Sequence, residues 1–345
     1  MTRSPLRRGG ARALRVLGLL LAVVLSSPGA AAAGEFRLAL PIDCRPGETC
    51  AVQNYPDRDA APGGVTDYTC GPQAYDGHTG VDIRLPNLAA MRRGVAVRAA
   101  AAGVVRAVRD GMQDVNVRTI GVEAVRDRFA GNAVVLQHPD GWVTQYSHLR
   151  QGSVQVKPGQ AVEVGQTLGL VGLSGMTEFP HLEIAVLRGG KHVDPFTGQD
   201  PAVPCGQPGA PLWTDEAAAA LSYQPLALLQ AGFSTEPPTW AAVQDDPPVP
   251  GPVTPGAGAL VFWTELINLR AGDQLVQSLH GPDGSELARH TERFTRQRAV
   301  HFQMIGRKRP PAGWGAGEYT GTVTVEREGA APRRWSRVVL VRPGG

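Results

Sequence analysis

Short apolar or alternating runs, separated by glycine and other turn residues, dominate the chain between residues 78 and 196. The runs fall at 95–101, 133–137, 142–146, 167–171 and 182–187. Runs of about five residues with turn signals every 8–12 residues or so are typical of β-strands in an all-β core. We therefore expect a small antiparallel β domain in this part of the chain.

The same alternation returns after residue 258, again with Gly and Pro turns between the runs. It covers 260–266, 275–279, 299–304, 319–325 and 335–341. A second, small β-sandwich is expected over 258–345. Its sequence shows no catalytic constellation, so a cell-wall or partner-binding module and a plain structural domain both remain open.

Two stretches interrupt the β pattern. Residues 214–232 begin with a Thr-Asp cap and an alanine run and end at Gly232, which predicts a helix, kinked or divided at Pro225. Residues 235–257 hold seven prolines and predict a stiff, extended linker.

The first 33 residues have the order of a secretory signal peptide. Five arginines and no acid precede the apolar run 16–25, and three alanines end the segment at Ala33. No later segment approaches the roughly 18 apolar residues of a membrane span. We expect an exported protein, periplasmic or extracellular, that has no membrane partner once the leader is removed.

The expected organisation follows from these boundaries. It is a signal peptide (1–33), a disulfide-tied lead-in (34–75), the first β domain (76–200), a helix with a Pro-rich linker (201–257) and the second β domain (258–345).

Removal of the leader changes the charge. The whole chain has 34 Lys and Arg against 31 Asp and Glu, and five arginines lie in the leader, so the remainder carries 29 − 31 = −2. No basic stripe is present, which argues against nucleic acid as a partner.

Four cysteines fit an oxidising compartment and allow three pairings. No Cys-x-x-Cys occurs, so disulfides are favoured over a zinc site. Cys44 and Cys50 flank a turn-like spacer and could close a small loop. Cys70 with Cys205 would then tie the start of the first domain to its end.

Three separated motifs carry candidate chemistry: Gly-His-Thr-Gly-Val-Asp at 77–82, Tyr-Ser-His-Leu at 146–149, and Phe-Pro-His-Leu-Glu at 179–183. Residues two or four apart in a strand have side chains on the same face. His181 and Glu183 would therefore share a face of one strand, and His78 and Asp82 would share a face of another if that segment is extended. Imidazole and carboxylate are zinc ligands, and catalytic zinc sites use three of them. Each motif alone is common; the combination is specific.

Together with their surroundings, these motifs resemble the lysostaphin-type (LytM-like) zinc endopeptidases over about residues 71–197. The similar segments include Val-x-Ala-x-x-x-Gly-x-Val at 97–105, Gln-His-Pro-Asp-Gly at 137–141, and the glycine-turned hairpins at 156–160 and 164–169. The resemblance implies a lysostaphin-like antiparallel β fold with barrel-sandwich hairpins and a groove over a metal site. It also implies hydrolysis of peptidoglycan cross-links.

Carried over by position, the resemblance makes His78 and Asp82 metal ligands and makes His148 and His181 the catalytic histidines. The family's third ligand is a histidine, but Glu183 stands at that position here. Two carboxylates neutralise a divalent ion, which weakens its effect on bound water, and oxygen ligands loosen the preference for zinc. Zn²⁺ is the expected cofactor, with Mn²⁺ or no metal as alternatives.

Three function classes follow. The first is a metalloendopeptidase acting on peptidoglycan peptides, with His148 as general base and His181 supporting the oxyanion. The second is an inactive LytM-like domain that binds cell wall or regulates a partner hydrolase. The third, suggested by hairpins like those of biotinyl carriers, is disfavoured because Lys157 lacks the carrier setting. The charged stretch 109–130 reads as a solvated loop or a determinant of specificity.

Overall fold

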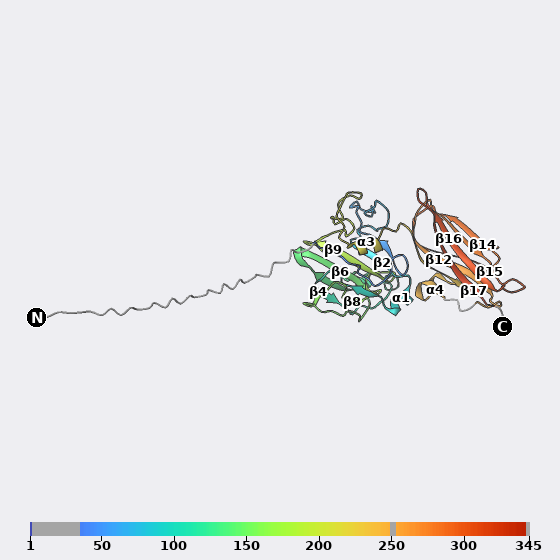
Figure 1. Ribbon diagram of the computed structural model, residues 1–345, viewed down its shortest axis with the longest axis horizontal. Helices are drawn as coiled ribbons and strands as arrows, with labels where there is room; N and C mark the ends of the chain where they lie inside the picture. The colour runs from blue at the N-terminus through green and yellow to red at the C-terminus, as the bar shows by residue number, and fades with distance from the viewer. Residues whose placement is uncertain (2–34, 249–252, 343–345) are drawn as a thin grey trace. The chain divides into compact units, whose positions relative to one another are not determined.

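The computed structural model describes residues 1, 35–248 and 253–342 (Figure 1). The expected signal peptide falls in residues 2–34 and so lies outside the described residues, apart from Met1. Among the residues described, no helix has the length and apolar character needed to cross a bilayer.

The first β domain is built on one large antiparallel sheet, which confirms the expected all-β fold. Its strands, from one edge to the other, are β1 (Ala51–Asn54), β2 (Val81–Arg84), β9 (His181–Arg188), β6 (Trp142–Leu149), β5 (Asn132–Gln137), β4 (Gly103–Arg109) and β7 (Ala161–Val162). β10 (Lys191–His192) pairs with β9, and β3 (Ala96–Arg98) pairs with β8 (Thr167–Leu170) in a separate two-stranded sheet. Every strand expected between residues 95 and 187 is present.

Alternation along β2, β6 and β9 gives the sheet two different faces. Val81, Ile83, Ile184 and Tyr146 are fully buried in the core on one face. The residues between them point the other way, because successive side chains of a strand alternate. Asp82 and Glu183 are such residues and lie directly opposite each other on neighbouring strands.

The helices are short. They are α1 (Leu88–Arg93), α2 (Val117–Ile120), α3 (Asp215–Ala220) and α4 (Trp240–Asp245), with 3-10 turns at Val122–Val125 and Pro139–Gly141. α2 and the first of these turns fall within 109–130, so the charged stretch is a structured excursion from the sheet.

The prediction of a helix over 214–232 is wrong for the second half of that range. α3 ends at Ala220, and Ala227–Ser234 forms strand β11, which pairs with β12 (Ala259–Leu269). A helix cannot continue regularly through Pro225, and after it the apolar residues follow the strand period, with Ala227, Leu229 and Phe233 buried. Gly232 therefore does not cap a helix. A Cβ at this position would lie 2.6 Å from the indole of Trp263, so the residue lies against that ring.

The prediction of an extended linker over 235–257 is also wrong where α4 lies. Thr239 caps this helix by accepting from the backbone N–H of Ala242, and Val243 is completely buried. Pro237 and Pro238 precede the cap and Pro247 follows the helix, so the prolines bound the element instead of preventing it.

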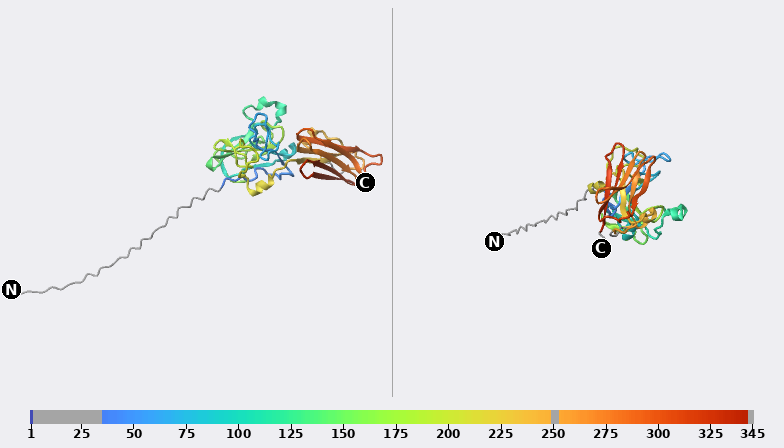
Figure 2. Two further views of the ribbon diagram at one scale, coloured as in Figure 1. Left: turned by 90° about the horizontal axis from the view of Figure 1, so that it is seen from above. Right: turned by 90° about the vertical axis from the view of Figure 1, so that its right-hand side faces the viewer.

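The C-terminal strands form two antiparallel sheets, as expected for a β-sandwich (Figure 2). One has the order β11-β12-β15, with β15 at Arg298–Lys308. The other has the order β14-β13-β16-β17, formed by Glu286–Arg293, Gln274–His280, Gly317–Glu326 and Arg333–Val341.

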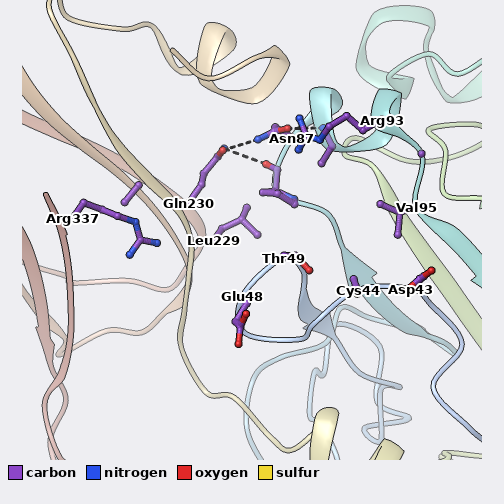
Figure 3. Close-up of a pocket in the computed structure, with 14 residues that line it drawn as sticks. Asp43, Cys44, Glu48, Thr49, Asn87, Arg93, Val95, Leu229, Gln230 and Arg337 are labelled. Atoms are coloured by element: carbon purple, nitrogen blue, oxygen red, sulfur yellow. Dashed lines mark hydrogen bonds between the residues drawn. The ribbon is translucent and has the colours of Figure 1, made fainter. Parts of the chain in front are cut away.

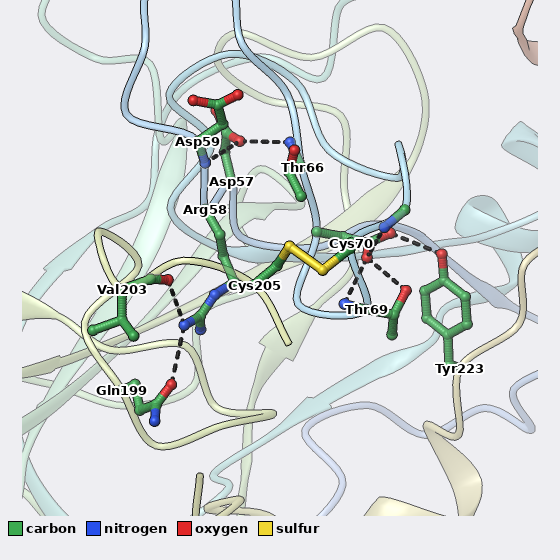
Figure 4. Close-up of a disulfide and its surroundings, with 12 residues drawn as sticks. Asp57, Arg58, Asp59, Thr66, Thr69, Cys70, Gln199, Val203, Cys205 and Tyr223 are labelled. Atoms are coloured by element: carbon green, nitrogen blue, oxygen red, sulfur yellow. Dashed lines mark hydrogen bonds between the residues drawn. A yellow bond between two sulfur atoms is a disulfide. The ribbon is translucent and has the colours of Figure 1, made fainter. Parts of the chain in front are cut away.

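Both expected disulfides, Cys44–Cys50 and Cys70–Cys205, are present. Beside the second one, Arg58 donates to Gln199 and to the carbonyl oxygen of Val203 (Figure 4). Arg58 also forms a buried ion pair with Asp194, at 3.0 Å. The lead-in is therefore joined to the end of the first β domain by covalent and ionic contacts.

Polar side chains also join the first β domain to β11 and β12. Gln230 of β11 accepts from Asn87 and donates to the carbonyl oxygen of Pro86, at the edge of a cavity of about 430 Å³ (Figure 3). None of the five expected site residues lines this cavity. Deeper in, Glu265 of β12 accepts from Gln230, Trp240 and Gln244, and Arg84 of β2 lies 3.8 Å away.

Candidate metal centre

The three expected ligands meet across two strands. Asp82 of β2 and Glu183 of β9 are a directly opposed pair in the antiparallel register. His78 lies just before β2, after a turn in which Gly77 has a φ of +73°. One ligand atom from each of the three residues falls within 4.8 Å of the others.

Glycine at position 80 makes this approach possible. A Cβ on Gly80 would stand 2.6 Å from Cγ and 2.7 Å from Oε1 of Glu183, closer than non-bonded atoms approach. The Gly between the His and Asp of the first motif therefore makes room for the Glu183 carboxylate.

The hydrogen bonding of the ligands suits a cation. Nε2 of His78 and Oδ1 of Asp82 are 3.3 Å apart and buried, and neither has a hydrogen-bond partner among the residues that the structure describes. The other carboxylate oxygen of Asp82 accepts from Asn54 at 2.8 Å, which fixes the group with Oδ1 toward the site. Buried polar atoms without partners are costly, so two of them converging beside a third ligand fit a metal ion.

His148 reaches this centre because β6 contains a bulge. Asn132 pairs with Leu149 and Val134 with Tyr146, so β6 has one extra residue there. His148 lies in the bulge with a φ of +62°, which is unusual for a residue with a side chain. Ser147 opposes Glu183, and strict alternation would point His148 away. The bulge instead brings its Nε2 to 3.3 Å from Oε2 of Glu183.

Backbone carbonyl groups orient both catalytic candidates. Nδ1 of His148 lies 2.8 Å from the carbonyl oxygen of Ser174, and Nδ1 of His181 lies 3.0 Å from that of Phe179. A carbonyl only accepts, so each Nδ1 carries the hydrogen and each Nε2 is left for the site. Nε2 of His181 is 3.5 Å from Oδ1 of Asp82, and the two imidazole rings are 4.5 Å apart.

Burial and the two carboxylates act in opposite directions on the histidine pKa values. Burial disfavours the charged rings, but Asp82 raises the pKa of His78 and Glu183 raises that of His148. At His181 burial wins and lowers the pKa to about 4. Burial also opposes ionisation of Asp82, yet His78 and His181 hold the pKa of that carboxyl well below its usual range.

All five residues expected from the sequence thus meet at one place on the sheet. The sequence did not point to the residues that support them: Asn54, Tyr75, Ser174 and Thr177. The ring of Tyr75 lies 4.2 Å from that of His78, and Oγ1 of Thr177 lies 3.1 Å from Nδ1 of His181. Asn54 ends strand β1 and the other three lie in irregular segments, and no spacing or periodicity distinguishes them.

Two other residues of the segments similar to the family lie elsewhere. His138 contacts the carbonyl oxygen of Ala102 and the hydroxyl of Thr144, within the sheet. Lys157 lies exposed in a turn between strands.

Comparison with known proteins places the first β domain in a family. Residues 76–195 match the model for peptidase family M23. Peptidoglycan DD-endopeptidase ShyC of Vibrio cholerae is 37% identical over 75 residues, which are 22% of this chain and 17% of that protein. Cell division protein DipM of Caulobacter vibrioides is 40% identical over 73 residues, 21% of this chain and 12% of DipM. The match thus spans less than a fifth of either relative.

Two solved structures are also similar. A zinc-containing peptidase from Vibrio cholerae has 28% identity over 42% of this chain and 39% of its own, with a TM-score of 0.27. The catalytic domain of lysostaphin from Staphylococcus simulans has 22% identity over 41% of this chain and 85% of its own, with the same TM-score. On the family match and the identities to ShyC and DipM, residues 76–195 form a domain of peptidase family M23.

Proposed function

We propose that this chain is a metalloendopeptidase that hydrolyses peptide bonds in peptidoglycan peptides. The observation that carries the proposal is the convergence of His78, Asp82 and Glu183 within 4.8 Å. Two of their buried ligand atoms have no hydrogen-bond partner in the described part of the chain. The family match and the names of the relatives support the substrate class.

In this proposal His78, Asp82 and Glu183 hold one Zn²⁺ or Mn²⁺. The bound ion supplies Lewis-acid chemistry, polarising a carbonyl group and lowering the pKa of a water molecule. With two carboxylate ligands the site has no net charge, whereas a His-Asp-His site has a net charge of +1. The neutral site should polarise a carbonyl group and lower the pKa of water less strongly, so we expect activity below that of a His-Asp-His site.

The two remaining histidines are the proposed acid–base groups. Nδ1 of His148 donates its hydrogen to the carbonyl oxygen of Ser174, so Nε2 is free of hydrogen and can take a proton as general base. His181 is held in the same way by Phe179. It can support an oxyanion only with a proton on Nε2, since its Nδ1 hydrogen is already engaged.

Wild-type protein provides the test. We expect about one divalent ion per chain by elemental analysis, and release of peptide fragments from purified cell wall in Zn²⁺ or Mn²⁺. Protein that binds neither ion and releases nothing in either would overturn the proposal.

One contact favours the second candidate, a non-catalytic domain that binds cell wall or regulates a partner hydrolase. Glu183 already has a partner, because Nε2 of His148 lies 3.3 Å from its carboxylate. An ion pair of this kind stabilises the site without metal. Metal-free protein that still sediments with cell wall is the expected result for this candidate.

We further propose export to an oxidising compartment, periplasmic or extracellular. The leader-like residues 1–33 and the two disulfides support this. Cell fractionation with an antibody to the chain tests it, and recovery in the cytoplasmic fraction alone is the contrary outcome.

A further inference from the structure

The excursion at residues 109–130 encloses a cavity of about 640 Å³. Arg109 and Arg128 line it together with Met112, Ile120, Val125 and Gly175. The cavity is thus partly apolar and carries two guanidinium groups.

One residue that lines this cavity, Gly175, belongs to the segment that orients the two histidines. Gly175 lines the cavity, the preceding carbonyl group of Ser174 holds His148, and Thr177 contacts His181. The backbone N–H of Val117, the first residue of α2, donates to the carbonyl oxygen of Thr177. The cavity is therefore connected to both histidines through the segment 174–177.

The charge of the cavity is positive. Arg109 donates to the carbonyl oxygen of Gly131, and Arg128 to that of Ala124. In the described part of the chain, neither guanidinium forms an ion pair. Both arginines therefore keep donors available for an anion.

Most nearby acids are engaged elsewhere. Asp110 accepts from the backbone of Gly152 and Asp114 from that of Gln151, while Glu123 pairs with Arg126 and Glu178 with Arg118. Asp127 is exposed and does not line the cavity.

The apolar surface around the cavity extends toward solvent. Ile120, Phe129 and Met176 are 43%, 44% and 41% exposed, which is high for side chains of this size. The backbone N–H of Met176 donates to the carbonyl oxygen of Phe129, so these two residues are neighbours. Apolar groups beside unpaired guanidinium groups suit a ligand that has both aliphatic and anionic parts.

We propose that this cavity is a subsite for a free carboxylate of the peptide substrate, bound by Arg109 and Arg128 while aliphatic parts of the peptide pack on Met112, Ile120 and Val125. This inference rests on the proposed function and deepens it, since it makes a free carboxylate near the scissile bond a determinant of specificity. The carboxylate is either the C-terminal group of the peptide or a side-chain group within it.

Peptide binding tests the subsite without turnover. The full chain carrying Glu183→Ala is titrated by calorimetry with a cross-linked stem peptide as the free acid, and with two analogues, amidated at the C-terminus or at the side-chain carboxyl. Amidation of the recognised carboxylate should weaken binding by about tenfold or more, because charge-assisted hydrogen bonds are lost. The analogue that binds weakly identifies which carboxylate is bound.

Variants assign the effect to the two arginines. Arg109→Gln and Arg128→Gln should each reduce the preference for the free acid, and Arg109→Lys should retain part of it. Arg106→Gln is the matched control, because Arg106 is exposed on the same strand β4 and does not line the cavity. Thermal unfolding confirms that each variant is folded.

Two results would overturn the inference: equal binding of all three peptides, or a preference that survives both glutamine variants. Failure of the proposed function is a separate outcome. In that case wild-type protein cleaves no cell wall with either metal, although the titrations still reveal whether the carboxylate is bound.

Discussion

At the scale of single residues, Glu183 decides the net charge of the proposed metal centre. Removing it with Glu183→Ala leaves two ligands, so metal affinity should fall by more than the roughly 10–100-fold typical of outer-shell substitutions. Glu183→His gives the site a net charge of +1 and should cleave cell wall at least as fast as wild type. Metal titrations and release of peptides measure both effects.

Glu163→Ala is the control for these variants, since Glu163 is exposed in a turn before β8 and does not belong to the cluster of three proposed ligands. Unchanged metal affinity in Glu183→Ala would mean that the carboxylate is not a ligand.

Gly80 is the second residue on which the centre depends. Its φ lies outside the left-handed region, so the effect of Gly80→Ala comes from overlap of the new methyl group with Glu183. We expect the carboxylate to shift, with metal affinity about tenfold or more below wild type. Gly258→Ala, with open space at the Cβ position, is the control, and equal metal affinity in the two variants would contradict the argument.

Each of the five residues proposed for the centre lies in a recognisable sequence motif, and the structure brings them together, while their roles stay predictions. The sequence could not show how His148 reaches the others. Along a regular strand His148 would face away from Glu183, and only the extra residue in β6 and the positive φ turn it inward. A bulge depends on the register between two strands, which the sequence of one strand does not reveal.

At the scale of elements, alternation predicted the central strands well and failed where two patterns overlap. Residues 227–234 are apolar and follow an alanine-rich helix, so they looked like its continuation. Their pairing with β12 and the contact of Gly232 with Trp263 make them a strand. The exposed strand β14 was missed because its residues are mostly polar, with no buried face to produce an apolar pattern.

Helix α4 provides a test at this scale, because proline content had predicted an unpacked linker there. Val243 is completely buried. Val243→Ala should therefore lower the free energy of unfolding by about 1–3 kcal/mol, through lost burial and a residual cavity. Urea denaturation measures the change. Ala241→Ser, at an exposed position of the same helix, should be nearly neutral. Two neutral variants would indicate that α4 is not packed in solution.

At the scale of the whole molecule, the M23 domain and the C-terminal strands share a buried polar network. Glu265 is fully buried, and its carboxylate accepts from Gln230, Trp240 and Gln244. Arg84 is also buried, and its guanidinium lies over the ring of Phe179, two residues before His181. The C-terminal strands are thus connected through side chains to the strand that carries Asp82.

This network predicts that the two parts stabilise each other. Glu265→Ala leaves the Arg84 guanidinium without its carboxylate and removes the acceptor of three other donors. The free energy of unfolding should fall by about 3–5 kcal/mol. Glu318→Ala, exposed on β16, should have little effect.

In the double variant Arg84→Met with Glu265→Ala, the buried unpaired charge is gone. The double variant should therefore lose less free energy of unfolding than the two single variants lose in total, by about 0.5–3 kcal/mol. Denaturant unfolding of the four proteins measures the coupling, and strictly additive losses would mean that Arg84 and Glu265 do not interact across the two parts.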